Sequence, residues 1–432
     1  MASATTSENN QTLDFGLEGI HVERALSIWA PILLGMMTNS RPRFKHVEFE
    51  DNGEDEDNEN NNPHREAVME LDHEMESIIR RMRTSATILQ LLQVNSDSPA
   101  APALYVFGDS LFDSGNNNLL PTLAKADFRP YGVNFDGGAT GRFTDGKIIP
   151  DLIAEFLGLP FSPPYLSIRG SPKLTGLNFA SASCGILPET GNYLGKCLNF
   201  AEQIDLFNHT IELELPKHYK TSSEVANYLS KSVFLVTIGS NDYINNYLEP
   251  QLYDTNQRYD PQSFARLLVD KLFLQFQRLY KIGARKIIMF EIGAIGCIPS
   301  VTRQFKHSGQ CVEKINQLAV TFNNQLATLL KNLTLTLQDS EFILGQAHML
   351  GYDAVINPSN YGLKDSSNPC CITWANGTSA CIPGLVACQD PDKHYFWDGY
   401  HLTESAYKLI ATRCINGTSV CVPKNIKDLV QI

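Results

Sequence analysis

Short apolar runs alternate with longer helix-like stretches along most of this 432-residue chain, and this alternation limits the folds open to it. The runs are rich in β-branched and aromatic residues, which favour strands. Intervening stretches such as 261–283 repeat apolar residues every three or four positions, as an amphipathic helix does. Strands that alternate with helices predict an α/β fold, with a parallel sheet covered on both faces. We expect about five strands, near residues 104–107, 176–180, 232–239, 286–293 and 341–346.

The expected strands end in short segments of glycine and polar residues. The first runs into Gly-Asp-Ser and presents Ser110, and a later one ends in Gly-Ser-Asn-Asp at 239–242. In parallel sheets the chemistry collects just beyond the carboxyl ends of the strands. A single serine on a glycine turn at such an end indicates a nucleophile.

A serine hydroxyl becomes a good nucleophile only when a base removes its proton and a third group holds that base. Histidine is the usual base near neutral pH. His401 is the best candidate, because Asp398 precedes it by three residues at the expected start of a helix. This spacing lets the carboxylate reach Nδ1 while Nε2 faces outward. A chance Asp and His on a loop is the alternative reading of this segment alone.

Acyl transfer also needs hydrogen-bond donors where negative charge develops, known as an oxyanion hole. The backbone N–H of Ser110 is one candidate donor. Gly185 lies in the small-residue loop "ASASCGIL", where backbone can approach a substrate closely. Asn241 offers a side-chain amide in "TIGSNDYI", although an asparagine in such a turn is often only a turn former.

The N-terminal quarter differs from the rest of the chain in charge. Residues 1–100 carry 18 Asp and Glu against 8 Lys and Arg, whereas the whole chain has a net charge of −12. "EFEDNGEDEDNENNN" is acidic and lacks apolar periodicity, so we predict a largely disordered extension over residues 1–100. The folded domain is expected over 101–425. The chain has 35 Lys and Arg against 47 Asp and Glu, so its composition does not predict the basic surface that nucleic-acid binding requires.

Two apolar segments in this extension bear on targeting. Residues 25–37 are too few to span a bilayer, so no transmembrane segment is predicted. Residues 82–101 have a basic start, a weakly apolar stretch and a small-residue run, and they resemble a degraded secretory signal. A short amphipathic helix is the alternative. If the signal interpretation holds, residues 1–81 are an upstream extension.

The cysteines and glycosylation motifs favour an oxidising, secretory compartment. All ten cysteines lie between Cys184 and Cys421, and none has the C-x-x-C spacing of a zinc or redox site. A chain with ten free cytosolic thiols is the alternative. The same region holds four N-x-[ST] motifs, whose asparagines are Asn208, Asn332, Asn376 and Asn416.

Four motifs together resemble a known family. "FGDSLFDSGNNN", "GLNFASASCGIL", "IGSND" and "FWDGYHLTE" are similar, in order and spacing, to the four sequence blocks of plant-type GDSL esterase/lipases in the SGNH hydrolase superfamily. The likeness covers roughly residues 101–425. It implies a flavodoxin-like, three-layer α/β/α fold and hydrolysis of carboxylic esters with no cofactor or metal.

The resemblance also implies a role for each matching residue. Ser110 is the nucleophile, and Asp398 and His401 complete the triad. Gly185 and Asn241 join the Ser110 N–H as oxyanion donors. The second block departs from the family pattern, with Ala-Ser-Cys at 182–184 where glycine and alanine are more usual. A disulfide between Cys184 and Cys197 would hold that loop, whereas the pairing of Cys370, Cys371, Cys381 and Cys388 is left open.

Three functions are compatible with these motifs. The first is a secreted serine esterase or lipase that acts on lipid or other extracellular plant acyl esters. The second is a polysaccharide deacetylase or a transacylase on the same fold, because substrate loops rather than the triad choose between them. The third is a non-catalytic binding protein, which the intact triad residues disfavour. The oligomeric state does not follow from the sequence.

Overall fold

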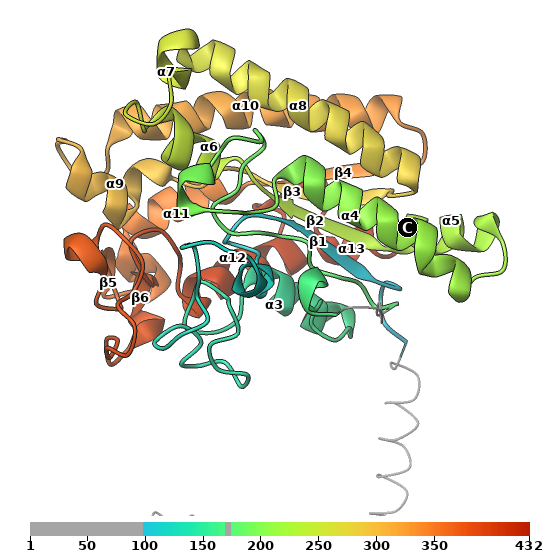
Figure 1. Ribbon diagram of the computed structural model, residues 1–432, viewed down its shortest axis with the longest axis horizontal. Coiled ribbons are helices and arrows are strands. Elements are labelled where there is room, and N and C mark those ends of the chain that lie inside the picture. The colour runs from blue at the N-terminus through green and yellow to red at the C-terminus, as the bar shows by residue number, and fades with distance from the viewer. Residues whose placement is uncertain (1–97, 169–173) are drawn as a thin grey trace, which may run out of the picture. The chain divides into compact units, whose positions relative to one another are not determined.

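A five-stranded sheet forms the centre of the computed structural model, which describes residues 98–168 and 174–432 (Figure 1). Within these residues the strand order is β1-β2-β3-β4-β7. The first four strands pair in parallel, and the short β7 pairs antiparallel to β4. The α/β fold with a mostly parallel sheet is therefore confirmed. The strands are β1 (Leu104–Gly108), β2 (Val233–Thr237), β3 (Lys286–Phe290), β4 (Glu341–Gly345) and β7 (Cys421–Val422).

The predicted strand at 176–180 is wrong as a member of this sheet. Asn178 forms only isolated bridges, with Val106 and with Pro164. The segment nevertheless lies beside the outer edge of β1, where the N–H of Phe179 donates to the carbonyl of Val106 at 2.7 Å. The fifth strand, β7, was not predicted, because two residues are too few to give a periodic pattern.

Alternation along the strands divides the core between the two faces of the sheet. Tyr105 and Phe107 pack with one cluster, whereas Leu104 and Val106 pack with another. Figure 1 shows α4, α8 and α10 on one side of the sheet and α3 and α12 on the other. The first three helices are α4 (Phe200–Leu213), α8 (Pro261–Ile282) and α10 (Glu313–Thr336), and the other two are α3 (Ile149–Leu157) and α12 (Glu404–Asn416).

Shorter elements complete the described chain. A parallel pair of strands, β5 and β6, lies outside the main sheet. Its strands are β5 (Asp365–Pro369) and β6 (His394–Phe396). Among the described residues, the remaining α-helices are α5 (Ser222–Lys231), α6 (Ser240–Asp242), α7 (Thr255–Arg258), α9 (Pro299–Gln304), α11 (Ala347–Ile356) and α13 (Ile426–Leu429). Among the residues described, none of the helices combines the length and apolarity needed to cross a membrane.

Local sequence signals set the starts of the longest helices. Asn199 accepts the N–H groups of the first turn of α4, and Glu202 accepts the N–H of Asn199 in return at 2.9 Å. At the start of α8 the side chain of Asp260 accepts the N–H groups of Gln262 and Ser263, and Pro261 occupies the first turn, where its missing N–H costs nothing. These caps explain why α4 and α8 begin where the sequence changes from turn residues to an apolar repeat.

All ten cysteines are paired. The predicted bond between Cys184 and Cys197 is confirmed, and the four cysteines left open pair as Cys370–Cys388 and Cys371–Cys381. The other two disulfides are Cys297–Cys311 and Cys414–Cys421. A third, smaller core cluster forms around Tyr131, Phe143 and Trp397 with cysteines of the 370–388 segment.

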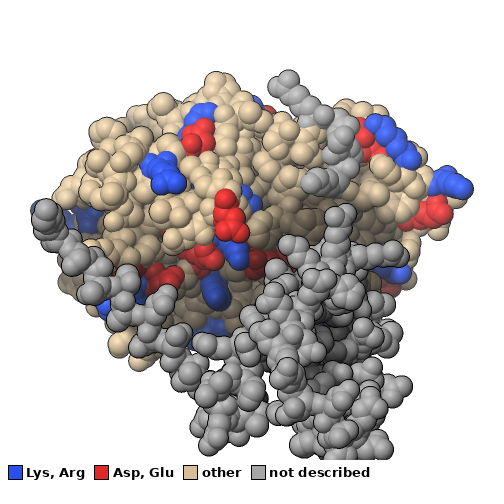
Figure 2. Space-filling model, turned by 90° about the horizontal axis from the view of Figure 1, so that it is seen from below, with Lys and Arg blue, Asp and Glu red and all other residues tan. Residues whose placement is uncertain are grey.

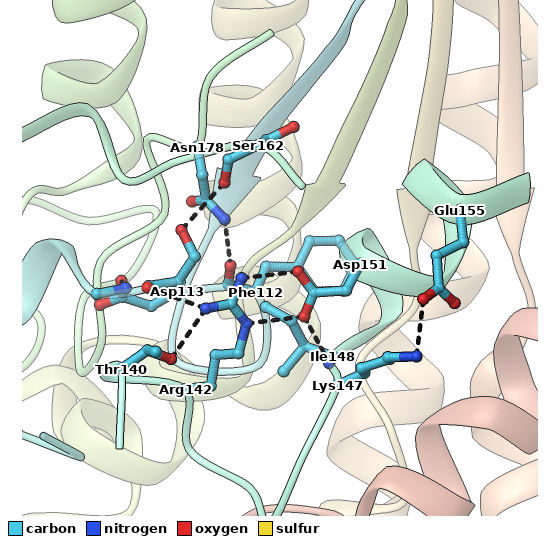
Figure 3. A network of polar contacts seen from close by, with 12 residues as sticks. Phe112, Asp113, Thr140, Arg142, Lys147, Ile148, Asp151, Glu155, Ser162 and Asn178 are labelled. Atoms are coloured by element: carbon cyan, nitrogen blue, oxygen red, sulfur yellow. Dashed lines mark hydrogen bonds and ion pairs between the residues drawn. The ribbon is translucent and has the colours of Figure 1, made fainter. Parts of the chain in front are cut away.

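A buried ion pair ties the loop that follows the first block to α3 (Figure 3). The guanidinium of Arg142 donates to both carboxylate oxygens of Asp151, at 2.8 and 2.7 Å, and to Thr140 at 2.9 Å. Asp151 also accepts the N–H of Ile148 at the start of the helix. Both charged side chains are almost fully buried, so each depends on the other for its solvation.

We therefore expect Arg142→Met to lower the free energy of unfolding by about 3–5 kcal/mol, because it leaves a buried carboxylate unpaired. In the double variant Arg142→Met with Asp151→Asn the free energy of unfolding should fall by less. The amide that replaces the carboxylate is neutral and still accepts the N–H of Ile148. Urea unfolding of both variants is the measurement. A double variant no more stable than the single one would contradict the argument.

Residues 1–97 are outside the described part of the chain. The predicted N-terminal extension (residues 1–100) and the signal-like segment at 82–101 therefore lie mostly outside it. On the face of the molecule shown in Figure 2, Lys and Arg side chains are interspersed with Asp and Glu.

Candidate active site

Ser110 lies two residues beyond the carboxyl end of β1, on a turn that the neighbouring strand shapes. The N–H of Asp109 donates to the carbonyl of Thr237, the last residue of β2, at 3.1 Å. Gly108 has a φ of 145°, and a Cβ there would lie 2.1 Å from the same carbonyl. Only glycine fits so close to β2, so the turn presents the serine at the sheet edge.

Asp113 joins the first block to the second. Its buried carboxylate accepts the N–H groups of Gly115 and Asn116, both at 2.7 Å, and that of Ala182 at 3.2 Å. Burial raises the pKa of Asp113 to about 6, although these hydrogen bonds favour the charged form. The carboxylate thus fixes the loop after Ser110 against the loop that carries Gly185.

Asp398 and His401 lie in a tight loop before α12. Phe396 pairs with Leu402, and the N–H of Trp397 donates to the carbonyl of His401 at 2.8 Å, which closes the loop. The Nδ1 of His401 lies 2.8 Å from Oδ2 and 2.9 Å from Oδ1 of Asp398. Oδ1 of Asp398 also accepts the backbone N–H groups of Tyr400 and His401, both at 2.8 Å.

The histidine also contacts the serine. Nε2 of His401 lies 2.8 Å from Oγ of Ser110, although the two residues are 291 positions apart in the sequence. The ring of Phe143 lies 4.8 Å from the imidazole, centroid to centroid, and supports it from the side. The histidine is 7% exposed and Asp398 is fully buried, so water has little access to the Asp–His contact.

Tyr131 is a neighbour of this group that the sequence analysis did not find. Its hydroxyl donates to Oδ2 of Asp398 at 2.7 Å and accepts the N–H of Cys381 at 3.1 Å. Burial by itself would raise the pKa of Asp398, but attraction to His401 and the hydrogen bonds from His401 and Tyr131 outweigh it. The pKa of Asp398 therefore lies below its ordinary value. No local pattern could have indicated a contact across 267 positions.

The loop of the second block is held by Asp242. This buried carboxylate accepts the N–H groups of Ile186 at 2.7 Å and Leu187 at 3.0 Å, together with the hydroxyl of Thr190 at 2.8 Å. A Cβ at Gly185 would lie 2.5 Å from both of its oxygens. Only glycine therefore fits at position 185, because a side chain there would collide with the carboxylate of Asp242.

Asn241 has its amide oriented by two neighbours. Its Nδ2 donates to the carbonyl of Cys184 at 3.0 Å, and its Oδ1 accepts a hydrogen bond from Asn245 at 2.9 Å. An amide nitrogen carries two hydrogens, and these contacts use only one of them. The second N–H of Asn241 is therefore left to donate to another group.

Ser110, His401 and Asn241 line a common cavity of about 530 Å³. In the adjoining loop Ala182 and Ser183 line it too, whereas Gly185 is not among its lining residues. Ser183 has a φ of 69°, which is uncommon for a residue other than glycine and turns the chain sharply here. The walls are mainly apolar, with side chains that include Leu111, Phe143, Phe290, Ile295, Ile298 and Phe396.

One group of metal-ligand residues occurs in the described residues, but its sulfurs are bonded to each other. Cys370, Cys388 and His394 place their ligand atoms within 4.8 Å of one another. Because the two cysteines form a disulfide, they offer no thiolate to a metal. The group is a structural link near the last block.

Comparisons with known proteins show the family of the chain. Residues 104–414 match the family described as GDSL-like Lipase/Acylhydrolase. The chain belongs to this family. GDSL esterase/lipase 7 of Arabidopsis thaliana is 45% identical over 324 residues, which cover 74% of this chain and 89% of that protein. GDSL esterase/lipase At1g71691 of the same plant is 40% identical over 346 residues, covering 79% and 89%.

This GDSL protein is therefore a serine hydrolase that acts on carboxylic esters. The expected family, fold and enzyme class are confirmed. The family match, residues 104–414, includes all the residues that line the cavity.

Several buried carboxyl groups of the enzyme have raised pKa values because burial disfavours their charged form. The pKa rises to about 7 for Asp109 and to about 6 for Asp113, Asp242 and Glu291. In the unfolded chain these groups titrate near pH 4. Between these values the folded protein binds more protons than the unfolded chain, so its stability falls as pH rises.

We expect the urea midpoint of unfolding to be higher at pH 5 than at pH 8. The stabilising contribution of these groups is complete below about pH 4 and is lost as pH rises through about 6 to 7. Asp109→Asn removes the group that titrates highest and should flatten the decline between pH 6 and pH 8. A midpoint that rises from pH 5 to pH 8 would rule out this assignment.

Proposed function

We propose that Ser110, His401 and Asp398 are the catalytic triad of this esterase. The support is the chain of contacts from Ser110 Oγ through both imidazole nitrogens to a carboxylate with a lowered pKa. A carboxylate that stays ionised holds the imidazole in the tautomer that accepts the serine proton at Nε2. The 2.8 Å contact between Ser110 and His401 is the observation that carries the proposal.

The reaction proceeds through an acyl-enzyme. Ser110 Oγ forms a bond to the ester carbonyl carbon while its proton passes to Nε2 of His401. The tetrahedral intermediate collapses, and the imidazolium returns the proton to the departing alcohol. Water then attacks the acyl carbonyl carbon while His401 takes its proton. As this second tetrahedral intermediate collapses, the imidazolium returns the proton to Ser110 Oγ, which releases the carboxylic acid and the free enzyme.

The oxyanion donors in this proposal are the N–H groups of Ser110 and Gly185 and the free N–H of the Asn241 amide. The position of Asn241 on the cavity wall, with its amide held by Asn245, supports its part. Asp242 supports the part of Gly185, because it accepts the N–H groups of Ile186 and Leu187, the two residues that follow this glycine. Preorganised donors of this kind stabilise developing charge without reorganisation during the reaction.

The proposed substrates are esters with a substantial apolar part, as in lipids or other plant acyl esters. The largely apolar lining of the cavity supports this choice over a polysaccharide, whose hydroxyl groups would be left without partners there. The lining contains three residues of the types Asp, Glu, Lys and Arg, namely Asp109, Lys125 and Glu291. An uncharged acyl chain fits walls of this composition.

We also propose that the enzyme is secreted and glycosylated. Five disulfides are typical of proteins that fold in an oxidising compartment. Three of the four N-x-[ST] asparagines are exposed, and Asn208 is half-buried in α4. The exposed asparagines are Asn332, Asn376 and Asn416.

A fluorophosphonate probe tests the nucleophile directly. Full-length protein should become covalently labelled, and Ser110→Ala should abolish the labelling together with ester hydrolysis, because no other serine has an imidazole base at 2.8 Å in the described residues. Ser240→Ala is the matched control, since this serine lines the same cavity without contacting His401. Labelling that persists in Ser110→Ala protein excludes the assignment.

Tyr131→Phe tests the contact behind the triad. We expect kcat/KM to fall about tenfold, because a buried hydrogen bond to a charged group is lost. The acid limb of its pH profile should move to higher pH. Without the hydrogen bond from Tyr131, the negative charge of Asp398 is less stabilised and attracts the protonated imidazole more strongly.

Tyr228→Phe is the control for the loss of a buried tyrosine hydroxyl, because that hydroxyl donates to the carbonyl of Leu174 and has no contact with the triad. Its acid limb should match that of the unmodified enzyme. If Tyr131→Phe lowers kcat/KM but does not move the acid limb of the pH profile, the hydroxyl of Tyr131 contributes only to packing. That result would contradict the interpretation.

A further inference from the structure

Large apolar side chains are exposed at the entrance of the active-site cavity. Leu123 is 82% exposed and Trp374 is 56% exposed, and both line the cavity. Each therefore contacts solvent on one side and the substrate path on the other. Single exposed leucines are ordinary on protein surfaces, but exposed residues that continue into an apolar cavity mark an interaction site.

The segment that carries Trp374 has no charge. From Ser366 to Gln389 the sequence contains no Asp, Glu, Lys or Arg. The disulfides Cys370–Cys388 and Cys371–Cys381 both lie within this segment and constrain its shape. Beside the cavity entrance the chain thus has a disulfide-linked segment without charged side chains of its own.

Backbone pairing shows which side chains share this surface. Cys371 and Ala387 pair in an antiparallel bridge, and both pack with the third core cluster. Side chains alternate along paired strands, so the next residues, Ile372 and Val386, face the opposite way, and they are 50% and 79% exposed. Thr373 is buried, which places Ile372 and Trp374 on the same side.

Leu123, Ile372, Trp374 and Val386 together are called the apolar rim. Lys125 is the charged residue of the neighbouring loop that lines the cavity, and its ammonium group already donates to the carbonyl of Asn118 at 2.8 Å. The four rim side chains carry no charge, and the exposed charges of the neighbouring loop, Asp127 and Arg129, are opposite in sign, so the rim gains no net attraction to an anionic or a cationic surface. Its chemistry fits an uncharged, apolar partner.

We propose that the apolar rim docks on the surface of an aggregated, uncharged ester lipid and so delivers single ester molecules to Ser110. This inference rests on the proposed ester hydrolysis and names the physical form of its substrate. Burial of the four rim side chains against lipid removes apolar surface from water, which favours attachment. The ester then passes into the cavity between Leu123 and Trp374 without crossing water.

A flotation assay tests docking apart from turnover. Full-length Ser110→Ala protein is mixed with an emulsion of an uncharged triacylglycerol, and the fraction that floats with the droplets is measured. Ile372→Ser combined with Val386→Ser changes two rim residues that do not line the cavity, and it should weaken attachment about tenfold or more. Leu335→Ser is the matched control, because this leucine is 75% exposed near the end of α10, before β4 and away from the carboxyl ends of the strands.

Hydrolysis by otherwise unmodified enzyme completes the test. On a short, fully dissolved ester the rim double variant should keep its kcat/KM within about twofold, whereas on the emulsion its rate should fall about tenfold. Unchanged flotation and emulsion turnover would overturn the docking proposal and leave ester hydrolysis intact. Loss of activity on the dissolved ester in the unmodified enzyme would instead remove the proposed function.

Discussion

The contact between Ser110 and His401 depends on where parallel strands end. β1 and β2 pair in register from Leu104–Val233 to Gly108–Thr237, so their carboxyl ends lie level and their following turns share one edge of the sheet. The last block reaches that edge from 291 residues away, through the loop that Phe396 and Leu402 close. A shift of this register would separate the hydroxyl from the imidazole.

Buried carboxylates hold the loops around this edge. Asp113 links the first block to the second, and Asp242 links the third block to the second, in each case by accepting backbone N–H groups. Burial raises the pKa of both. Asp398 is equally buried, yet its pKa is lowered, because it faces His401 and receives the hydroxyl of Tyr131. The pKa of a buried aspartate thus depends on its neighbours, both for the two loop anchors and for the member of the proposed triad.

The disulfide-linked segment at 370–388 connects several of these features. Its inner side forms the small core cluster with Tyr131 and Trp397, and the N–H of Cys381 binds the hydroxyl that contacts Asp398. Its outer side carries Ile372, Trp374 and Val386 at the cavity entrance. This disulfide-linked segment therefore contacts the proposed triad through Tyr131 and forms the surface that we assign to lipid docking.

Periodicity and motifs in the sequence were enough to predict the α/β class, four of the five strands and the residues now proposed for catalysis, because strand ends and glycine turns are encoded locally. The edge position of 176–180, the hydroxyl of Tyr131 and the Arg142–Asp151 pair were not predictable from local pattern. Each depends on burial and hydrogen bonds between segments that only the folded chain brings together, and such contacts leave no period or spacing in the sequence.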